Sequence, residues 1–350
     1  MNRSVWSVVR IAVSSSRSEA SRHLSARKRM GWWFAAALLF AAVLPNLASA
    51  ADGAAPGAKS AMPTTLPVAP AALRFQVVEG AGGVPLNVVT AGDKSKPPIL
   101  LVHGIGQSYV SWENQLRAPL TNEFYVVAFD LRGHGNSGKP WNKDAYQDYR
   151  NYAGDVQAVI KATGLDRPVL VGWSYGTLIV ADYLREYGAS GLRGIVLTGA
   201  YGGLTPPPAA APPAVAEMMA RNRERQLSAN LEDNIAAART GARLLTGHEM
   251  PPAWYDRATQ LALMLPAYAR RSMFDRSLAN MDQIAKITVP FLVTVGGKDI
   301  STPESVARDL VAKVKGARVS VYPESGHSPF AEEPERYNRE LGEFARAALR

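Results

Sequence analysis

Short apolar runs alternate with longer amphipathic segments along most of the chain. Several runs, such as residues 99–102, 125–129 and 169–173, are apolar at nearly every position and rich in β-branched residues. Runs of this kind are typical of strands that helices cover on both faces. The pattern therefore predicts an α/β fold with a mostly parallel eight-stranded sheet flanked by helices. The expected strands are residues 75–78, 86–89, 99–102, 125–129, 169–173, 194–198, 291–295 and 319–322.

Amphipathic segments between these strands predict helices. In residues 145–163, Tyr152, Val156 and Ile160 fall on one helical face, and Gly164 is the expected stop. The expected helices are residues 112–120, 145–163, 177–187, 304–314 and 335–349.

Residues 201–288 break the alternation, because they contain no convincing strand. They begin with the proline-rich stretch 206–213 and continue with helix-like segments at 214–245 and 254–278. We interpret this interval as a helical cap inserted between two strands of a domain at 73–350. A separate small helical domain is the alternative. Apolar residues of the interval either pack the cap or line a pocket.

The first 50 residues have the features of a signal peptide. Arg27-Lys28-Arg29 precedes an apolar run at 32–44, and Ala48-Ser49-Ala50 follows it. The run has 13 residues, fewer than the about 18 that a membrane span requires. We therefore expect cleavage after Ala50, an exported (periplasmic or secreted) protein and no stable membrane anchor; the alternative is an anchor formed by the uncleaved segment. Residues 51–72, rich in Ala and Pro, are expected to form a flexible leader.

Charge and composition exclude several classes of function. The formal net charge is +9, but residues 1–50 hold seven Lys and Arg and one Glu, which leaves only +3 on the remainder. No basic cluster with interleaved aromatic residues follows residue 51, so no nucleic-acid partner is expected. The absence of cysteine excludes disulfides and a thiol nucleophile. No histidine pair has metal-ligand spacing, so neither a metal nor a cofactor is expected.

A candidate nucleophile lies in Gly172-Trp173-Ser174-Tyr175-Gly176, between an expected strand and an expected helix. A serine in this context occupies a tight, strained turn that exposes its hydroxyl, and the turn requires glycine at the flanking positions. Trp173 is a possible substrate contact, although burial alone also explains a tryptophan there.

A serine hydroxyl becomes a nucleophile only when a base takes its proton and a third group orients that base. Of the five histidines, His327 follows the last expected strand, and Asp299 follows the strand at 291–295. Open α/β sheets place their sites at these carboxyl ends. Glu304 and Glu324 are the alternative acids.

Backbone N–H groups are expected to stabilise the oxyanion of a tetrahedral intermediate. His103-Gly104-Ile105-Gly106 follows the strand at 99–102, so the donors would be the N–H groups of Ile105 and Tyr175. We expect His103 to support this loop and His134 to support a glycine-rich turn, rather than to take part in catalysis.

From about residue 75 to 350, excluding the cap, the chain resembles the serine hydrolases of the α/β-hydrolase family. The resemblance rests on residues 103–106, 130–137, 172–176, 297–299 and 326–327, and on the chain order Ser174, Asp299, His327. It implies an esterase-like fold with a helical cap. Ser174 separates the chain from similar family members with an aspartate nucleophile, the haloalkane dehalogenases and soluble epoxide hydrolases.

The resemblance implies hydrolysis of a carboxylic ester or related acyl compound through an acyl-enzyme, with a small-molecule acyl substrate as the partner. Ser174 would attack, His327 would act as base and then acid, and Asp299 would orient His327.

Four further activities within the family remain open: a C–C bond hydrolase of ring-cleavage products, a perhydrolase or cofactor-free haloperoxidase, a lactonase, and an aminopeptidase acting on N-terminal proline. The C–C hydrolases tend to carry an aromatic residue where Ser328 stands, and the long cap is atypical of the haloperoxidases. A non-catalytic ligand receptor is the possibility from another class, but such proteins often lose a triad residue, and this chain has all three.

Overall fold

The computed structural model describes residues 72–206 and 212–350. The predicted signal peptide at 1–50 and residues 51–71 of the predicted leader lie outside the described residues. Within the described ranges, no helix is both long and apolar enough to cross a membrane.

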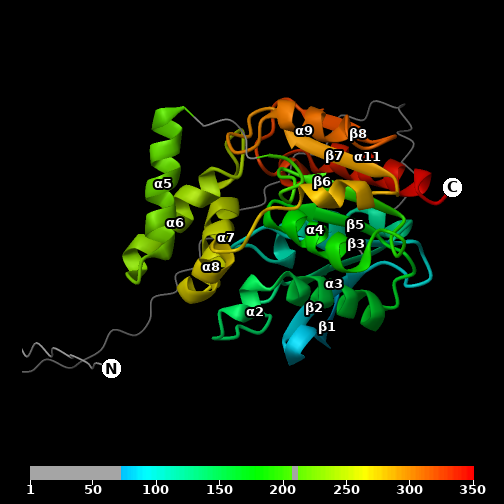
Figure 1. Cartoon of the computed structure of the whole chain (residues 1–350), viewed down its shortest axis with the longest axis horizontal. Coiled ribbons are helices and arrows are strands. Elements are labelled where there is room, and N and C mark those ends of the chain that lie inside the picture. Colours follow the sequence, from blue (N-terminus) through cyan, green and yellow to red (C-terminus); the bar gives the residue numbers. More distant parts are fainter. Residues whose placement is uncertain (1–71, 207–211) are drawn as a thin grey trace, which may run out of the picture. The chain divides into compact units, whose positions relative to one another are not determined.

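One eight-stranded sheet organises the described chain, in the order β1-β2-β4-β3-β5-β6-β7-β8 (Figure 1). β2 is antiparallel to β1 and β4, and every other neighbouring pair is parallel. The eight predicted strands and the mostly parallel sheet are thereby confirmed. The strands are β1 Arg74–Glu79, β2 Pro85–Ala91, β3 Pro98–Val102, β4 Tyr125–Phe129, β5 Val169–Trp173, β6 Gly194–Thr198, β7 Phe291–Gly296 and β8 Arg318–Tyr322.

Helices cover both faces of the sheet. Along β3, Leu100 and Val102 belong to one apolar cluster, whereas Ile99 and Leu101 belong to the other. Successive side chains of a strand point to opposite faces of the sheet. A strand that contributes to an apolar cluster on each face must therefore be apolar at every position. The first cluster includes residues of α3 Tyr149–Thr163, α4 Tyr175–Tyr187 and α9 Glu304–Val311; the second includes residues of α1 Glu113–Leu116, α10 Pro329–Glu332 and α11 Pro334–Ala347.

Two predicted helices are interrupted. The helix expected at 112–120 is wrong as a single element, because a 3₁₀ turn at Tyr109–Trp112, α1 and a second 3₁₀ turn at Pro119–Asn122 replace it. Pro119 restricts Ala118 to an extended backbone, which ends the first helix. The helix expected at 145–163 breaks at Asp148, which is extended, separates α2 Asp144–Gln147 from α3 and caps α3 through the N–H of Arg150. Gly164 ends α3 in the left-handed conformation, as predicted.

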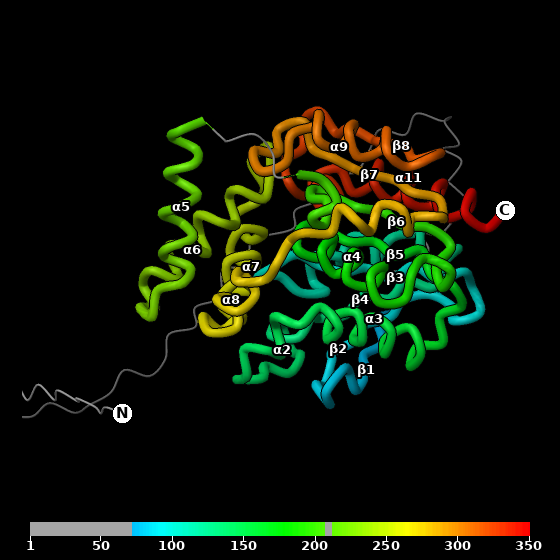
Figure 2. Tube along the Cα trace, viewed as in Figure 1, coloured from blue at the N-terminus to red at the C-terminus, as the bar shows by residue number. Residues whose placement is uncertain are grey.

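The described residues between β6 and β7 form four α-helices: α5 Pro213–Leu227, α6 Leu231–Arg243, α7 Pro252–Leu263 and α8 Ala267–Phe274. No strand forms in the described residues of this interval. The segments expected to be helical at 214–245 and 254–278 each divide in two, at the Asn230 cap of α6 and at Pro266 before α8. The four helices gather at one end of the sheet, where α8 lies beside α2 (Figure 2). We call them the cap helices.

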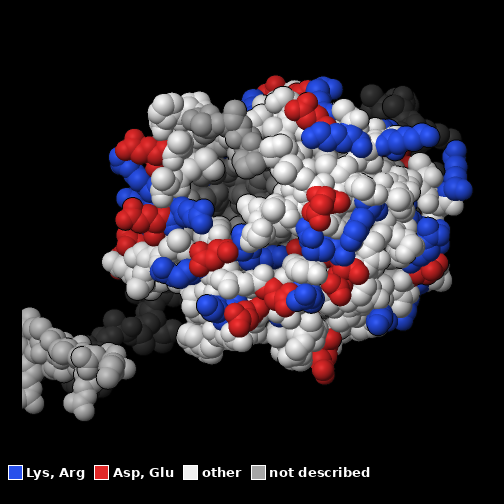
Figure 3. Space-filling model, in the orientation of Figure 1, with Lys and Arg blue, Asp and Glu red and all other residues white. Residues whose placement is uncertain are grey.

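Charged side chains of both signs are interspersed on the face shown in Figure 3. One charge in the interior of the sheet domain is paired with an opposite charge. Arg132, in the turn after β4, donates to Asp155 of α3 through Nε (2.7 Å) and Nη2 (2.6 Å), and both side chains are almost fully buried. This ion pair fixes the turn after β4 to the helix layer.

Replacing Asp155 by Asn should lower the free energy of unfolding by about 3–5 kcal/mol, because it leaves the buried Arg132 guanidinium without a compensating charge. Asp166→Asn is the matched control, since Asp166 pairs with Arg193 but its side chain is 82% exposed. That control should cost less than about 1 kcal/mol. Denaturant unfolding measures both values, and equal losses would contradict the prediction.

Candidate active site

Ser174 stands in a strained turn between β5 and α4. Its φ of 53° and ψ of −120° fall in a region that side-chain-bearing residues rarely adopt. The neighbouring glycines make the turn sterically possible. A Cβ on Gly172 would lie 2.7 Å from the Gly176 carbonyl oxygen, and a Cβ on Gly176 would collide with the carbonyl oxygen of Val102. The glycine spacing in the sequence therefore has a direct steric cause.

Hydrogen bonds hold the Ser174 peptide on both sides. Its N–H donates to the Thr198 carbonyl of β6 at 3.0 Å, and its carbonyl accepts from the Thr177 hydroxyl at 2.6 Å. The Thr177 hydroxyl in turn accepts from the N–H of Gly202, in the segment that leaves β6. The strained conformation is thus fixed by the sheet and by the start of α4.

His327 and Asp299 meet beyond the ends of β8 and β7. The Nδ1 atom of His327 lies 2.7 Å from Oδ2 of Asp299. The other two candidate acids lie elsewhere in ion pairs, Glu304 with Arg308 and Glu324 with Lys298. Within the described residues, Asp299 is the predicted acid that contacts the His327 imidazole.

Burial and charge act against each other in this pair. Burial favours the uncharged forms, so it raises the pKa of Asp299 and lowers that of His327. Their mutual attraction and hydrogen bond outweigh burial, which leaves the pKa of Asp299 below its ordinary value and that of His327 above it. Asp299 is therefore held ionised, and His327 is a stronger base than an ordinary histidine.

Ser301 was not predicted from the sequence, yet it supports the acid. Its N–H and its hydroxyl both donate to Oδ1 of Asp299, at 2.8 and 2.6 Å, and these bonds also lower the pKa of Asp299. The hydroxyl lies 3.2 Å from Nδ1 of His327 as well. A serine two residues after an aspartate is common in turns, so the sequence carries no specific signal for this role.

The backbone of His327 is fixed by the neighbouring strand ends. The Trp173 indole donates to the His327 carbonyl at 2.8 Å, so this buried tryptophan positions the loop that carries His327. Gly199, directly after β6, has a φ of 65°, and a Cβ there would lie 2.7 Å from the same carbonyl oxygen. Gly199 was also missed, and its only sequence signal is its place at a strand end.

The loop after β3 lies against Ser174. A Cβ on Gly104 would come within 2.9 Å of the Ser174 Cβ, so glycine is required for this approach. The N–H of Ile105 has no protein acceptor within the described residues. Tyr175 is the first residue of α4, a position whose N–H has no acceptor inside the helix. Both predicted oxyanion donors therefore belong to residues that lie beside Ser174.

His103 and His134 are fully buried. His103 accepts from the Leu131 N–H at 3.0 Å, and its other ring nitrogen lies 2.7 Å from the Gly104 carbonyl. Burial lowers the pKa of both histidines, and for His134 the neighbouring His103 lowers it further. Both are neutral rings. His103 joins the loop after β3 to the turn after β4, whereas His134 bonds within that turn, with its Nδ1 3.1 Å from the Arg132 carbonyl.

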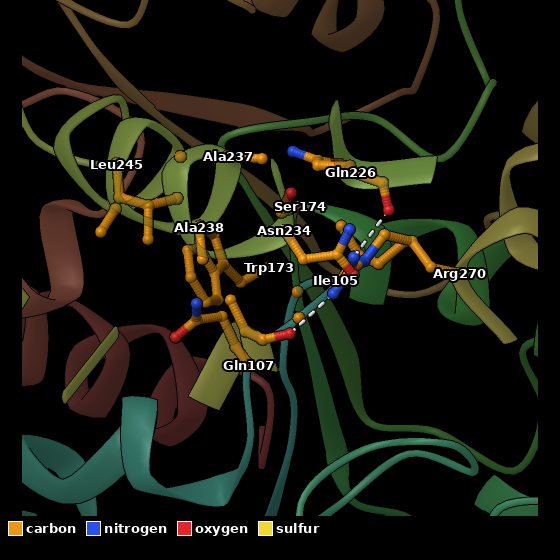
Figure 4. Close-up of a pocket in the computed structure, with 15 residues that line it drawn as sticks. Ile105, Gln107, Trp173, Ser174, Gln226, Asn234, Ala237, Ala238, Leu245 and Arg270 are labelled. Atoms are coloured by element: carbon orange, nitrogen blue, oxygen red, sulfur yellow. Dashed lines mark hydrogen bonds between the residues drawn. The ribbon is translucent and has the colours of Figure 1, made fainter. Parts of the chain in front are cut away.

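Ser174 lies where two cavities meet. The larger, of about 710 Å³, also contacts His327 and has mostly apolar walls, including Leu178, Leu278 and Met281. The smaller, of about 140 Å³, lies between the loop after β3 and the cap helices, and Arg270 lines it (Figure 4). Within the described residues, Ser174 Oγ makes no hydrogen bond with His327, although both face the larger cavity. Such bonds are often long before substrate binds.

Glu332 joins the loop that carries His327 to the segment after α6. Its carboxylate accepts from the N–H of Gly326 at 2.8 Å and from that of Gly247 at 2.7 Å, and its charge also raises the pKa of His327. The two glycine backbones touch, because a Cβ on Gly247 would lie 2.6 Å from the nitrogen of Gly326. This contact was not predicted, since it joins residues far apart in the sequence.

No group of three or more metal-ligating side chains lies together in the described ranges. The site therefore consists of a serine, a histidine–carboxylate pair, candidate oxyanion donors and two cavities of different character.

Comparisons with known proteins agree with this architecture. Residues 97–334 match the model of the alpha/beta hydrolase fold family. A candidate aryl esterase from Burkholderia cenocepacia is 31% identical, with a TM-score of 0.73 over 79% of this chain and 99% of its own. An esterase from Rhodococcus sp. ECU1013 is 28% identical, with a TM-score of 0.69 over 78% of this chain and 99% of its own.

A bifunctional esterase/perhydrolase of Acinetobacter calcoaceticus is 28% identical over 278 residues, which cover 76% of this chain and 97% of that protein. The family match alone spans more than half of this chain. The protein is therefore a hydrolase that belongs to the α/β-hydrolase fold family.

Proposed function

We propose that the protein is a serine hydrolase that cleaves a carboxylic ester or a related acyl substrate. The observation that carries the proposal is the convergence of a strained, cavity-facing Ser174 with a histidine whose Nδ1 is bound to a carboxylate. The esterases among the similar proteins support the same reaction class.

In this mechanism, the Asp299 carboxylate accepts the Nδ1–H of His327 and leaves Nε2 free to act as the base. Nε2 takes the Ser174 proton while Oγ attacks the substrate carbonyl, and the N–H groups of Ile105 and Tyr175 bind the resulting oxyanion. His327 then gives that proton to the leaving alcohol, and the acyl-enzyme forms. Water, deprotonated by His327, releases the acid and restores Ser174.

Perhydrolysis is the second candidate, because it uses the same acyl-enzyme with peroxide in place of water. The similar esterase/perhydrolase of Acinetobacter calcoaceticus favours it over C–C bond hydrolysis and over lactone hydrolysis. Assaying peracid formation beside ester hydrolysis separates the two activities.

Ser174→Ala should reduce turnover of short p-nitrophenyl esters by about 10⁶-fold, or to the background rate, because it removes the nucleophile. The wild type should be labelled by a fluorophosphonate and the variant should not. Ser190→Ala, an exposed serine beyond α4, is the control and should retain both activities. Wild-type turnover by Ser174→Ala would exclude this mechanism, and failure of the folded wild type to label would favour a receptor.

The acid limb of kcat/KM should have its midpoint above the ordinary histidine pKa of about 6.5, because His327 is active only as the neutral base and its pKa is raised. Asp299→Asn removes the largest raising influence on that pKa, so the midpoint should move to lower pH while the rate falls by about 10⁴-fold. Glu324→Gln, at an exposed acid paired with Lys298, should leave the limb in place. An unmoved midpoint in Asp299→Asn would contradict this assignment.

A further inference from the structure

A buried arginine lines the small cavity beside Ser174. Arg270 belongs to α8, is 5% exposed and faces the cavity that Gly104, Trp173 and Ser174 border from the sheet side (Figure 4). Its Nη1 donates to the Gln226 carbonyl at 2.8 Å, and its Nη2 donates to the carbonyls of Ala262 (2.7 Å) and Leu265 (3.0 Å).

Arg270 differs from the other buried arginines in having no carboxylate partner. In the described ranges three arginines are buried, and two of them form ion pairs, Arg132 with Asp155 and Arg276 with Asp182. The three acceptors of Arg270 are neutral, and none of the described acidic side chains lines the small cavity. Burial accordingly lowers the pKa of Arg270, with no nearby anion to offset it. A buried cation without a counter-charge is costly, and a bound anion would remove that cost.

Fixing the end of α5 does not by itself explain why Arg270 is buried. The next residue, Arg271, donates to the adjacent carbonyl of Leu227 from the exposed side of the same helix. An arginine at a helix C-terminus performs this role from solvent, at no desolvation cost. Arg270 therefore has two features that Arg271 lacks. It bonds to the carbonyls of Ala262 and Leu265 near the end of α7, and its guanidinium lies at the wall of the cavity beside Ser174.

We propose that Arg270 binds a carboxylate on one arm of the substrate, so that the preferred substrates are esters with one short anionic arm and one apolar arm. The proposal rests on the ester hydrolysis proposed above and specifies its substrate class. The small cavity, of about 140 Å³, is near the size of a cavity that holds benzene, so the anionic arm has only a few carbons. Gln107 and Asn234 add polar groups to its wall, and the larger apolar cavity receives the second arm.

The test compares carboxylate substrates with neutral carboxamides of the same shape. One pair is butyl hydrogen glutarate and the butyl ester of glutaramic acid, with the charge on the acyl arm. The other is the butyryl ester of γ-hydroxybutyrate and its carboxamide, with the charge on the alcohol arm. Titration of released acid gives kcat/KM for each. Wild type should prefer the carboxylate in at least one pair, by about tenfold to hundredfold, as expected for a hydrogen-bonded charge.

Arg270→Met should reduce that ratio to about one, and Arg270→Lys should keep part of it. Arg271→Met is the matched control from the same helix and should retain the wild-type ratio. If the role of Arg270 were purely structural, its replacement would lower the rates for the carboxylate and the carboxamide substrates alike and leave their ratio unchanged. That result, or a wild-type ratio of one or less in both pairs, would overturn the proposal.

Direct binding to the wild-type protein does not depend on how the variants fold. Calorimetry should detect binding of glutarate but not of glutaramide, and equal or absent binding of both would count against the anion site. If the wild type hydrolyses the carboxamide esters without preferring carboxylates, only the substrate class is wrong. If it hydrolyses no ester but binds glutarate through Arg270, the proposed function is wrong and the anion site stands.

Discussion

The site depends on one strained backbone position. Ser174 holds a conformation that costs about 1–3 kcal/mol, and the surrounding structure must supply that energy. β5 and α4, the elements before and after the turn, are buried and hold it in place. They approach each other closely because residues 172 and 176 are glycines. The turn also sets the direction of the Tyr175 N–H, so the strain positions the hydroxyl and a candidate oxyanion donor together.

Sheet topology brings the remaining groups to that position. β3, β5, β6, β7 and β8 are neighbours in the sheet and run parallel, so the loops that follow them leave from the same edge. The chain reverses its direction of travel across the sheet between β3 and β5, which opens a crevice where α/β proteins bind ligands. Each of the five loops places a residue near Ser174 or His327, namely Gly104, Ser174 itself, Gly199, Asp299 and His327.

The sequence predicts the groups that depend on local pattern. The strands are apolar throughout because both faces are buried, and Ser174, Asp299 and His327 each stand just beyond a strand. Supporting contacts such as that of Glu332 with Gly247 could not be predicted, because they join segments that meet only in the folded chain. Two of the helix breaks had a local signal that the predictions did not use, because Pro119 and Pro266 interrupt the segments expected to be helical. The break at Asp148 was missed for a different reason. The apolar periodicity of the sequence continues through Asp148. The hydrogen bond by which Asp148 caps α3, directly after α2 ends, depends on backbone geometry that the periodicity does not contain.

The proposed chemistry and the proposed selectivity therefore depend on different parts of the chain. The strand ends carry the proposed reactive groups, whose residue types are constrained by the reaction and form short motifs in the sequence. The small cavity is closed by residues of the cap helices, including Gln226, Asn234 and Arg270, which follow no such motif. Their character becomes visible only in the fold, where Arg132 and Arg276 pair with carboxylates and Arg270 is the exception among the buried arginines of the described residues. Under the proposed assignment, the buried charge of Arg270 indicates a substrate class that the catalytic motifs do not specify.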